Sequence, residues 1–164
     1  MTRICKITFE DILPIWNTLL WPNRESKIEP NSAMCLLGGY DMYNMNTEPT
    51  FFAYKLHGDI VGVNSGHMCK DKHYRSRGLY VKENFRGLYI GRDLLLATIE
   101  QGRSEGASLC WSYPRQTSWS TYRRAGFTLV SEWESSETSD SNAYCRFDYQ
   151  YQTPSLRQRL LNVR

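Results

Sequence analysis

The chain has 164 residues, of which 41% are hydrophobic and 23% charged, a composition typical of one globular domain with a single core. Its net charge of +3 is too small to indicate a nucleic-acid partner, and no apolar run is long enough to span a membrane. We therefore expect a cytoplasmic protein with no nucleic-acid or membrane partner, and the slight excess of basic residues suits an anionic cofactor.

The five cysteines are odd in number, widely scattered and without metal-like spacing. Cys69, Cys110 and Cys145 fall within strand-like runs, where a buried reduced thiol is the usual role. This pattern predicts neither a disulfide nor a structural metal.

The first fifty residues predict one strand, one helix and an irregular segment. Residues 3–7 alternate apolar and polar, as in a strand, and Thr8 with the acids after it resembles a helix start. Apolar residues then recur at helical spacing until Trp21-Pro22 ends the helix. Residues 22–49 are rich in Asn, Pro, Met and Gly, with a short helix predicted at 31–37.

The pattern is clearer from residue 50 onward, where hydrophobic runs alternate with turn signals. His57-Gly58-Asp59 indicates a hairpin, and 135–142, acidic and serine-rich, indicates a solvated loop. Residues 1–152 are predicted to be a single domain, and 153–164 a short, helical C-terminal tail. The predicted strands are 51–56, 60–69, 73–81, 107–113, 127–134 and 143–151, and we expect the last two to pair. Two helices are predicted in this part of the chain: one begins at the turn near 91 and ends at 103, and the other spans 117–125.

Between residues 79 and 96 a strand passes through an Arg- and Gly-containing turn directly into a helix. The first N–H groups of a helix lack internal partners, and the helix dipole places about half a positive charge there. Glycine permits a close approach of the backbone, so such a turn can surround a phosphate. The candidate cofactor-binding residues are Leu79, Tyr80, Val81, Arg86, Gly87, Leu88, Tyr89, Ile90, Gly91 and Arg92.

Two motifs in this half of the chain resemble those of the GNAT superfamily of N-acetyltransferases. Residues 86–91, Arg-Gly-Leu-Tyr-Ile-Gly, resemble its acetyl-coenzyme A signature, Gln/Arg-x-x-Gly-x-Gly/Ala, with Tyr89 in place of the middle glycine. Residues 122–127, Tyr-Arg-Arg-Ala-Gly-Phe, resemble its Tyr-x-x-x-Gly-Phe. Gly126 also reads independently as a glycine at the C-terminal end of a helix.

The resemblance implies an α+β fold, with a mixed, mostly antiparallel central sheet flanked by helices and a splayed strand pair that receives coenzyme A. It implies an N-acetyltransferase that uses acetyl-coenzyme A and no metal. The acceptor would be an amine of a small molecule, amino acid or peptide, which attacks the thioester directly. Two alternatives stay open: a longer acyl group, or a catalytically silent coenzyme A-binding module. The state of assembly, including a homodimer, is also open.

The same resemblance implies roles for individual residues. Tyr122 aligns with the family's general acid, since a phenol of pKa near 10 can protonate a thiolate; the alternative is a ring that only packs. Backbone N–H groups of 79–81 and of the strand at 109–111 would stabilise the oxyanion. Arg115 replaces an Asn found seven residues before the tyrosine in relatives, and could reach a phosphate.

Arg75 and Arg77 occupy the strand positions where some relatives carry a Glu or His base. Simple alternation places residues 75, 77, 79 and 81 on one face. Arginine cannot act as a base at neutral pH, so we expect a water chain to deprotonate the amine, with His73 and Glu83 as weaker candidates. The two arginines would suit a carboxylate or phosphate on the acceptor. Alternatively, they pair with neighbouring acids or face solvent.

Overall fold

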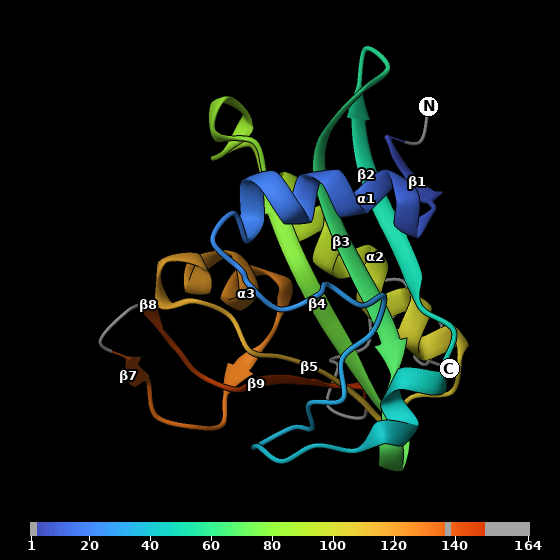
Figure 1. The fold of residues 1–164 in the computed structure, drawn as a ribbon, viewed down its shortest axis with the longest axis vertical. Coiled ribbons are helices and arrows are strands. Elements are labelled where there is room, and N and C mark those ends of the chain that lie inside the picture. Colours follow the sequence, from blue (N-terminus) through green and yellow to red (C-terminus); the bar gives the residue numbers. More distant parts are fainter. Residues whose placement is uncertain (1–2, 137–138, 150–164) are drawn as a thin grey trace, which may run out of the picture.

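The computed structural model describes residues 3–136 and 139–149 and has a seven-stranded sheet in the order β1-β2-β3-β4-β5-β9-β6 (Figure 1). All neighbouring strands are antiparallel except β4 and β5. The predicted mixed, mostly antiparallel α+β fold is therefore confirmed. The strands are β1 (Ile4–Ile7), β2 (Thr50–Leu56), β3 (Asp59–Met68), β4 (His73–Val81), β5 (Leu109–Ser112), β6 (Thr128–Leu129) and β9 (Cys145–Asp148).

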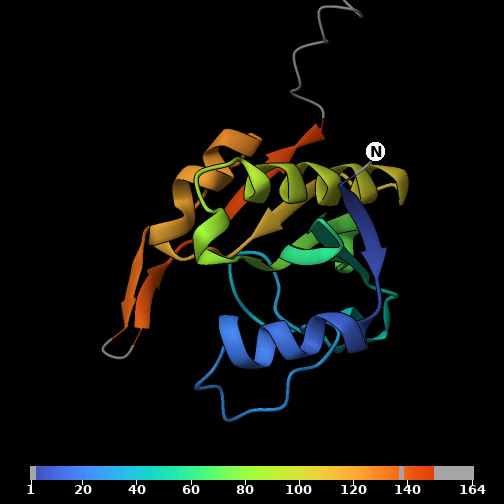
Figure 2. The ribbon, with the colours of Figure 1, turned by 90° about the horizontal axis from the view of Figure 1, so that it is seen from above.

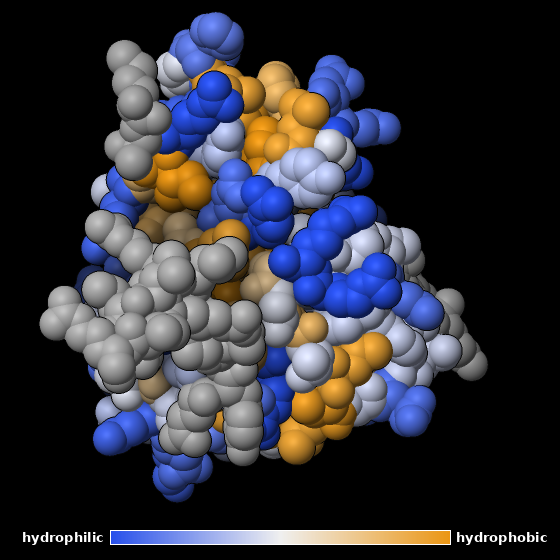
Figure 3. Space-filling view, turned by 180° about the vertical axis from the view of Figure 1, so that it is seen from behind, coloured by the Kyte–Doolittle hydropathy of each residue, from blue (hydrophilic) through white to orange (hydrophobic). Residues whose placement is uncertain are grey.

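Helices cover both faces of this sheet (Figure 2). One face carries α1 (Phe9–Ile15), which continues into the π-helical turn η1 (Trp16–Leu20). The other carries α2 (Ile90–Ser104) and the shorter α3 (Trp119–Ala125). Figure 3 shows the α2 side, where apolar patches are separated by hydrophilic side chains. Of the helices in the two described stretches, none has both the length and the apolar character needed to cross a bilayer.

The predicted start and end of the first helix are confirmed. The side chain of Thr8 accepts a hydrogen bond from the Asp11 amide, and the Asp11 carboxylate accepts one from the Thr8 amide, at 3.2 and 3.0 Å. This reciprocal capping satisfies two N–H groups that would otherwise lack partners. The helical segment ends at Leu20, and Trp16 is fully buried against the sheet.

Strand β4 contains a bulge at Gly78. Residues 77–80 of β4 lie opposite residues 63–65 of β3, so β4 has one extra residue there. Gly78 has a φ of +79°, and a Cβ at this position would overlap the indole ring of Trp16. Its carbonyl accepts a hydrogen bond from Trp16 Nε1 at 2.9 Å. The bulge is therefore fixed by a residue distant in sequence.

The bulge reverses the alternation of the strand, so the prediction that residues 75, 77, 79 and 81 share a face is wrong. The guanidinium of Arg77 lies over Trp16 on the α1 side, and Arg75 precedes it on the same face. Leu79 and Val81 instead pack into the apolar cluster under α2. An inserted residue shifts every following side chain to the opposite face.

Strands β4 and β5 pair only over residues 73–75 and 109–111. Beyond this point residues 76–81 of β4 continue without a β5 partner, so one edge of that stretch is open. The strand at 109–111 is therefore a member of the diverging pair, as expected, although residues 109–111 themselves form its paired end. The open part begins with Ser112, the last residue of β5.

The structure corrects two local predictions. Residues 31–37 form no helix: an isolated bridge joins Met34 to Tyr40, and a 3₁₀ helix follows at Met42–Asn46. The amide of Asn31 donates to the Asn44 carbonyl, and Asn44 itself is fully buried, so side-chain contacts rather than helical periodicity order this segment.

The second correction concerns the end of the chain. The predicted loop 135–142 contains a hairpin, β7 (Glu134–Ser136) with β8 (Ser139–Asn142), and the strand predicted over 127–134 is reduced to β6. The predicted pairing of the last two strands of the sheet holds for β6 and β9. The tail at 153–164 lies outside the described residues.

Candidate active site

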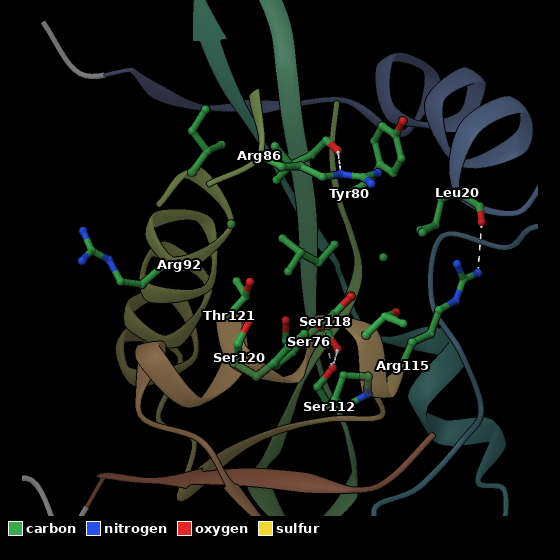
Figure 4. A pocket seen from close by; sticks show the side chains of 18 of the residues that line it. Leu20, Ser76, Tyr80, Arg86, Arg92, Ser112, Arg115, Ser118, Ser120 and Thr121 are labelled. Atoms are coloured by element: carbon green, nitrogen blue, oxygen red, sulfur yellow. Dashed lines mark hydrogen bonds between the residues drawn. The ribbon is translucent and has the colours of Figure 1, made fainter. Parts of the chain in front are cut away.

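A cleft of about 640 Å³ opens where β4 and β5 diverge, between η1, the start of α2, and α3 (Figure 4). Tyr122, Arg75, Arg77 and Arg115 all line it, as does every predicted cofactor residue except Leu88, which is 59% exposed. The volume is that of an ordinary ligand pocket. The fold thus brings together segments that the sequence analysis could only consider separately.

The turn before α2 has the geometry of an anion site. Gly87 and Tyr89 have positive φ angles of +80° and +61°, and α2 begins at Ile90 without a side-chain cap. The first N–H groups of α2 are therefore left without a capping side chain, at the positive end of the helix dipole. Gly91 packs against Thr121 of α3, where a Cβ would be too close, so glycine is needed there for close packing.

Two arginines flank this turn. Arg86 is exposed, and its Nε donates to the Val81 carbonyl at 2.9 Å. Arg92 pairs with Asp93 at 3.0 Å, lies over the Tyr89 ring and points away from the centre of the cleft (Figure 4). Arg86 is therefore the better placed of the two to meet a phosphate bound at the turn.

The first residues of α3 and the turn before it also line the cleft, and the sequence analysis did not single them out as site residues. Ser118, Ser120 and Thr121 present hydroxyl groups, and Arg124 lies over the Tyr89 ring at 5.7 Å. No local pattern marks these residues, because their proximity to the turn depends on how α2 and α3 pack.

Tyr122 lies at the inner end of the cleft and is only 4% exposed. Its hydroxyl is 3.5 Å from Ser112 Oγ, which donates to the Ser76 carbonyl on the facing strand at 2.9 Å (Figure 4). Burial raises the pKa of Tyr122 above its ordinary value of 10. The phenol therefore stays protonated at neutral pH and can act as a proton donor, although its ring also packs against Phe127.

Arg115 lies on the opposite wall from the phosphate turn (Figure 4). Its Nη2 donates to the Leu20 carbonyl at 3.2 Å, which joins the segment after β5 to the end of η1. In this position the side chain closes the cleft beside the first helix. It does not extend toward the turn before α2. That Arg115 could reach a phosphate stays a prediction.

Among the residues that the structure describes, Arg75 and Arg77 have no acidic ion-pair partner, and they do not simply face solvent. Arg75 donates to Ser32 Oγ at 2.6 Å, and Arg77 donates to the Glu29 carbonyl at 2.8 Å. Both partners belong to the irregular segment after the first helix. The two arginines thus hold that segment against β4 and line the cleft at the same time.

No Asp, Glu, His or Lys lines the cleft among the described residues. His73 and Glu83 are not among its lining residues. His67 is fully buried beneath Arg75 and Arg77, and desolvation with these two charges lowers its pKa to about 3. The described part of the chain also contains no cluster of His, Cys, Asp or Glu that could hold a metal.

Comparison with solved structures gives acetyltransferases of low sequence identity. An IAA acetyltransferase from Bacillus cereus matches with a TM-score of 0.64 at 17% identity, covering 88% of this chain and 97% of that one. An acetyltransferase from Bacillus subtilis in complex with CoA matches with 0.61 at 13%, covering 89% and 97%. The ribosomal-protein-S18-alanine N-acetyltransferase from Escherichia coli matches with 0.63 at 11%, covering 95% and 99%. These likenesses establish the fold.

A comparison with curated proteins gave no match. The model of the acetyltransferase (GNAT) family matches residues 13–127, a span that runs from the first helix through both sequence motifs. Together with the diverging strands and the uncapped start of α2, this match settles the classification. The chain belongs to the GNAT family of acetyltransferases.

Proposed function

We propose that this protein transfers the acetyl group of acetyl-coenzyme A to an amine of a small molecule, amino acid or peptide. The observation that carries the proposal is the cleft itself, in which an open strand edge, an uncapped helix start and a buried tyrosine hydroxyl meet. The family uses acetyl-coenzyme A, and one structural neighbour is a CoA complex, which supports the choice of cosubstrate.

In this proposal the pyrophosphate of the coenzyme binds at the turn from Arg86 to Gly91. The N–H groups at the start of α2 donate to its oxygens, and Arg86 supplies a charged donor. The pantetheine arm then follows the open edge of β4, residues 76–81, toward Tyr122. The backbone of that edge supplies donors for the thioester oxygen.

The chemical step is a direct displacement. The neutral amine attacks the thioester carbonyl carbon, a C–N bond forms and the C–S bond breaks. Tyr122 gives its proton to the leaving thiolate and recovers one from solvent. The attacking nitrogen loses its proton to water, because the described lining of the cleft contains no side chain that could accept it at neutral pH.

Calorimetry with acetyl-coenzyme A, followed by a thiol-release assay over a panel of amines, tests this proposal. Arg86→Glu removes a charged donor and places a carboxylate beside the phosphates, so we expect the Kd to rise by about tenfold or more. The matched control is Arg123→Glu, the same charge change at an exposed position on α3 outside the cleft.

An Arg86→Glu protein that binds acetyl-coenzyme A as tightly as the control would contradict the pyrophosphate assignment. Binding without thiol release over the whole panel would identify a silent coenzyme A-binding module. A preference for a longer acyl-coenzyme A in the same assay would show that the acyl donor is not acetyl-coenzyme A, without changing the assignment of the site.

A further inference from the structure

The cleft is strongly positive on the side away from the phosphate turn, where Arg75 and Arg77 lie. The two follow one another on the same face of β4, just before the bulge. Each guanidinium rests on an indole ring: Arg75 lies 4.9 Å from Trp111, and Arg77 lies 5.0 Å from Trp16. These contacts hold the two cations in fixed positions, since a guanidinium stacks well on an aromatic face.

Neither charge is balanced by an acid among the described residues. The hydrogen-bond acceptors are the Ser32 hydroxyl for Arg75 and two main-chain carbonyls, of Glu29 and Pro30, for Arg77. The carboxylate of Glu29 instead lies 3.5 Å from the Lys27 ammonium. Within the described stretches, the Nε atom of Arg75 is buried and has no hydrogen-bond partner. Arg77 is only 5% exposed and Arg75 is half-buried, and uncompensated charge in such surroundings is costly.

Burial and mutual repulsion both act on the pair. Desolvation lowers the pKa of Arg75 to about 10, and desolvation together with the charges of Arg75 and Arg24 lowers that of Arg77 to about 9, despite the opposing influence of Glu29. Both groups therefore remain charged at neutral pH. A bound anion would relieve the repulsion between them and satisfy their free donors.

The coenzyme does not account for this charge in the proposed arrangement. Its phosphates bind at Arg86 and the start of α2, whereas Arg75 and Arg77 lie beside η1 and the segment that follows it. Arg75 is close enough to Tyr122 for each to influence the pKa of the other. An anion held by this pair would therefore sit a short distance from the thioester.

We propose that the acceptor is a small amine that also carries an anionic group, a carboxylate or phosphate, separated from the amine by a short spacer and held by Arg75 and Arg77. This inference rests on the proposed acetyl transfer and names its substrate class. The pair fixes the anion, and the spacer places the nitrogen at the thioester. Discrimination arises because a neutral analogue leaves the charges of buried Arg77 and half-buried Arg75 unpaired.

The test compares acceptors that differ only in charge: β-alanine and 4-aminobutyrate against their amides, and phosphoethanolamine against ethanolamine. Acetyl-coenzyme A is saturating and ionic strength is constant. We expect kcat/KM to be about tenfold or more higher for the anionic member of a pair. An amide lowers the pKa of its amine and so enlarges the neutral fraction, which means that intrinsic reactivity alone would favour the amide. Comparison of the carboxylate pairs with the phosphate pair shows which of the two anionic groups the site prefers.

Substitutions of Arg75 and Arg77 test whether these side chains cause the preference for an anionic acceptor. Arg75→Gln and Arg77→Gln should each remove most of it, chiefly through KM, and leave the Kd for acetyl-coenzyme A unchanged. Arg75→Lys keeps the charge and should keep part of the preference. Arg123→Gln is the matched control, because Arg123 is exposed on α3 and lies outside the cleft lining. Thermal unfolding confirms that each variant is folded.

A binding experiment distinguishes failure of the anion site from failure of the proposed acetyl transfer. N-acetyl-β-alanine and its amide, the corresponding products, are titrated into the protein with coenzyme A present. Tighter binding of the carboxylate that is lost in Arg75→Gln supports the anion site even if no amine is acetylated. Equal binding of both, or equal kcat/KM for charged and neutral acceptors, overturns the anion site while acetyl transfer stands.

Discussion

The side chain on which the proposed chemistry depends most is Tyr122. Its hydroxyl is buried, close to Ser112 and protonated over a wide pH range, and the cleft wall that it forms is continuous with the open edge of β4. The family motif pointed to this residue in the sequence. Its burial and its hydroxyl neighbour come from the packing of α3 on the sheet.

Tyr122→Phe removes the proton donor and keeps the ring that packs against Phe127. The hydroxyl is needed as thiolate develops, so we expect kcat to fall about a hundredfold with little change in the Kd for acetyl-coenzyme A. Steady-state thiol release and calorimetry measure the two effects. Tyr54→Phe, which removes the hydroxyl of another buried tyrosine outside the cleft, is the control. Wild-type turnover in Tyr122→Phe would make the tyrosine structural.

At the scale of elements, the bulge in β4 decides what each side chain of that strand can do. It places Arg75 and Arg77 on the α1 side and turns Leu79 and Val81 toward α2. Without it the arginines and the two apolar residues would lie on the same face. The bulge therefore lets one strand line the cleft and contribute to the core.

Gly78→Ala should destabilise the protein by about 2 kcal/mol or more, because the φ of +79° is unfavourable for alanine and the added methyl meets Trp16. Urea unfolding measures the change. Gly58→Ala is the matched control: its φ is +85°, but a Cβ there meets no atom within 4 Å, so only the backbone cost remains. Equal losses in the two variants would show that the Trp16 contact adds nothing.

At the scale of the whole molecule, every charged side chain in the described lining of the cleft is positive. The described lining contains no acidic side chain and no histidine. Such a field favours an anionic cosubstrate and also lowers the pKa of a bound amine, which raises its neutral fraction. The arginines that line the cleft are Arg75, Arg77, Arg86, Arg92, Arg115 and Arg124.

This charge distribution predicts the pH dependence of acetyl transfer. We expect kcat/KM to rise with pH up to the pKa of the acceptor amine, because only the neutral amine attacks. The acid form of Tyr122 is the active one, and its pKa is raised from 10, so loss of this proton should not limit activity below about pH 10. For an anionic acceptor, loss of the charge on Arg77, whose pKa is lowered to about 9, should limit kcat/KM above about pH 9. Two acceptors of different amine pKa should give different inflections. A shared inflection near neutral pH would instead indicate a base on the protein.

The sequence by itself determined most of the helices and strands and the strand–turn–helix connection before α2, because capping residues, hydrophobic spacing and glycine positions act over a few residues. It also carried the two motifs that identify the family. The tertiary structure alone decided the bulge at Gly78, the partners of Arg75 and Arg77, and the direction of Arg115. These depend on contacts such as Trp16 with Gly78 and Arg115 with Leu20, 62 and 95 residues apart. Local patterns carry no information about pairings of that range. The two arginines that we propose to select the acceptor could therefore be named from the sequence, but their positions and partners could not be predicted.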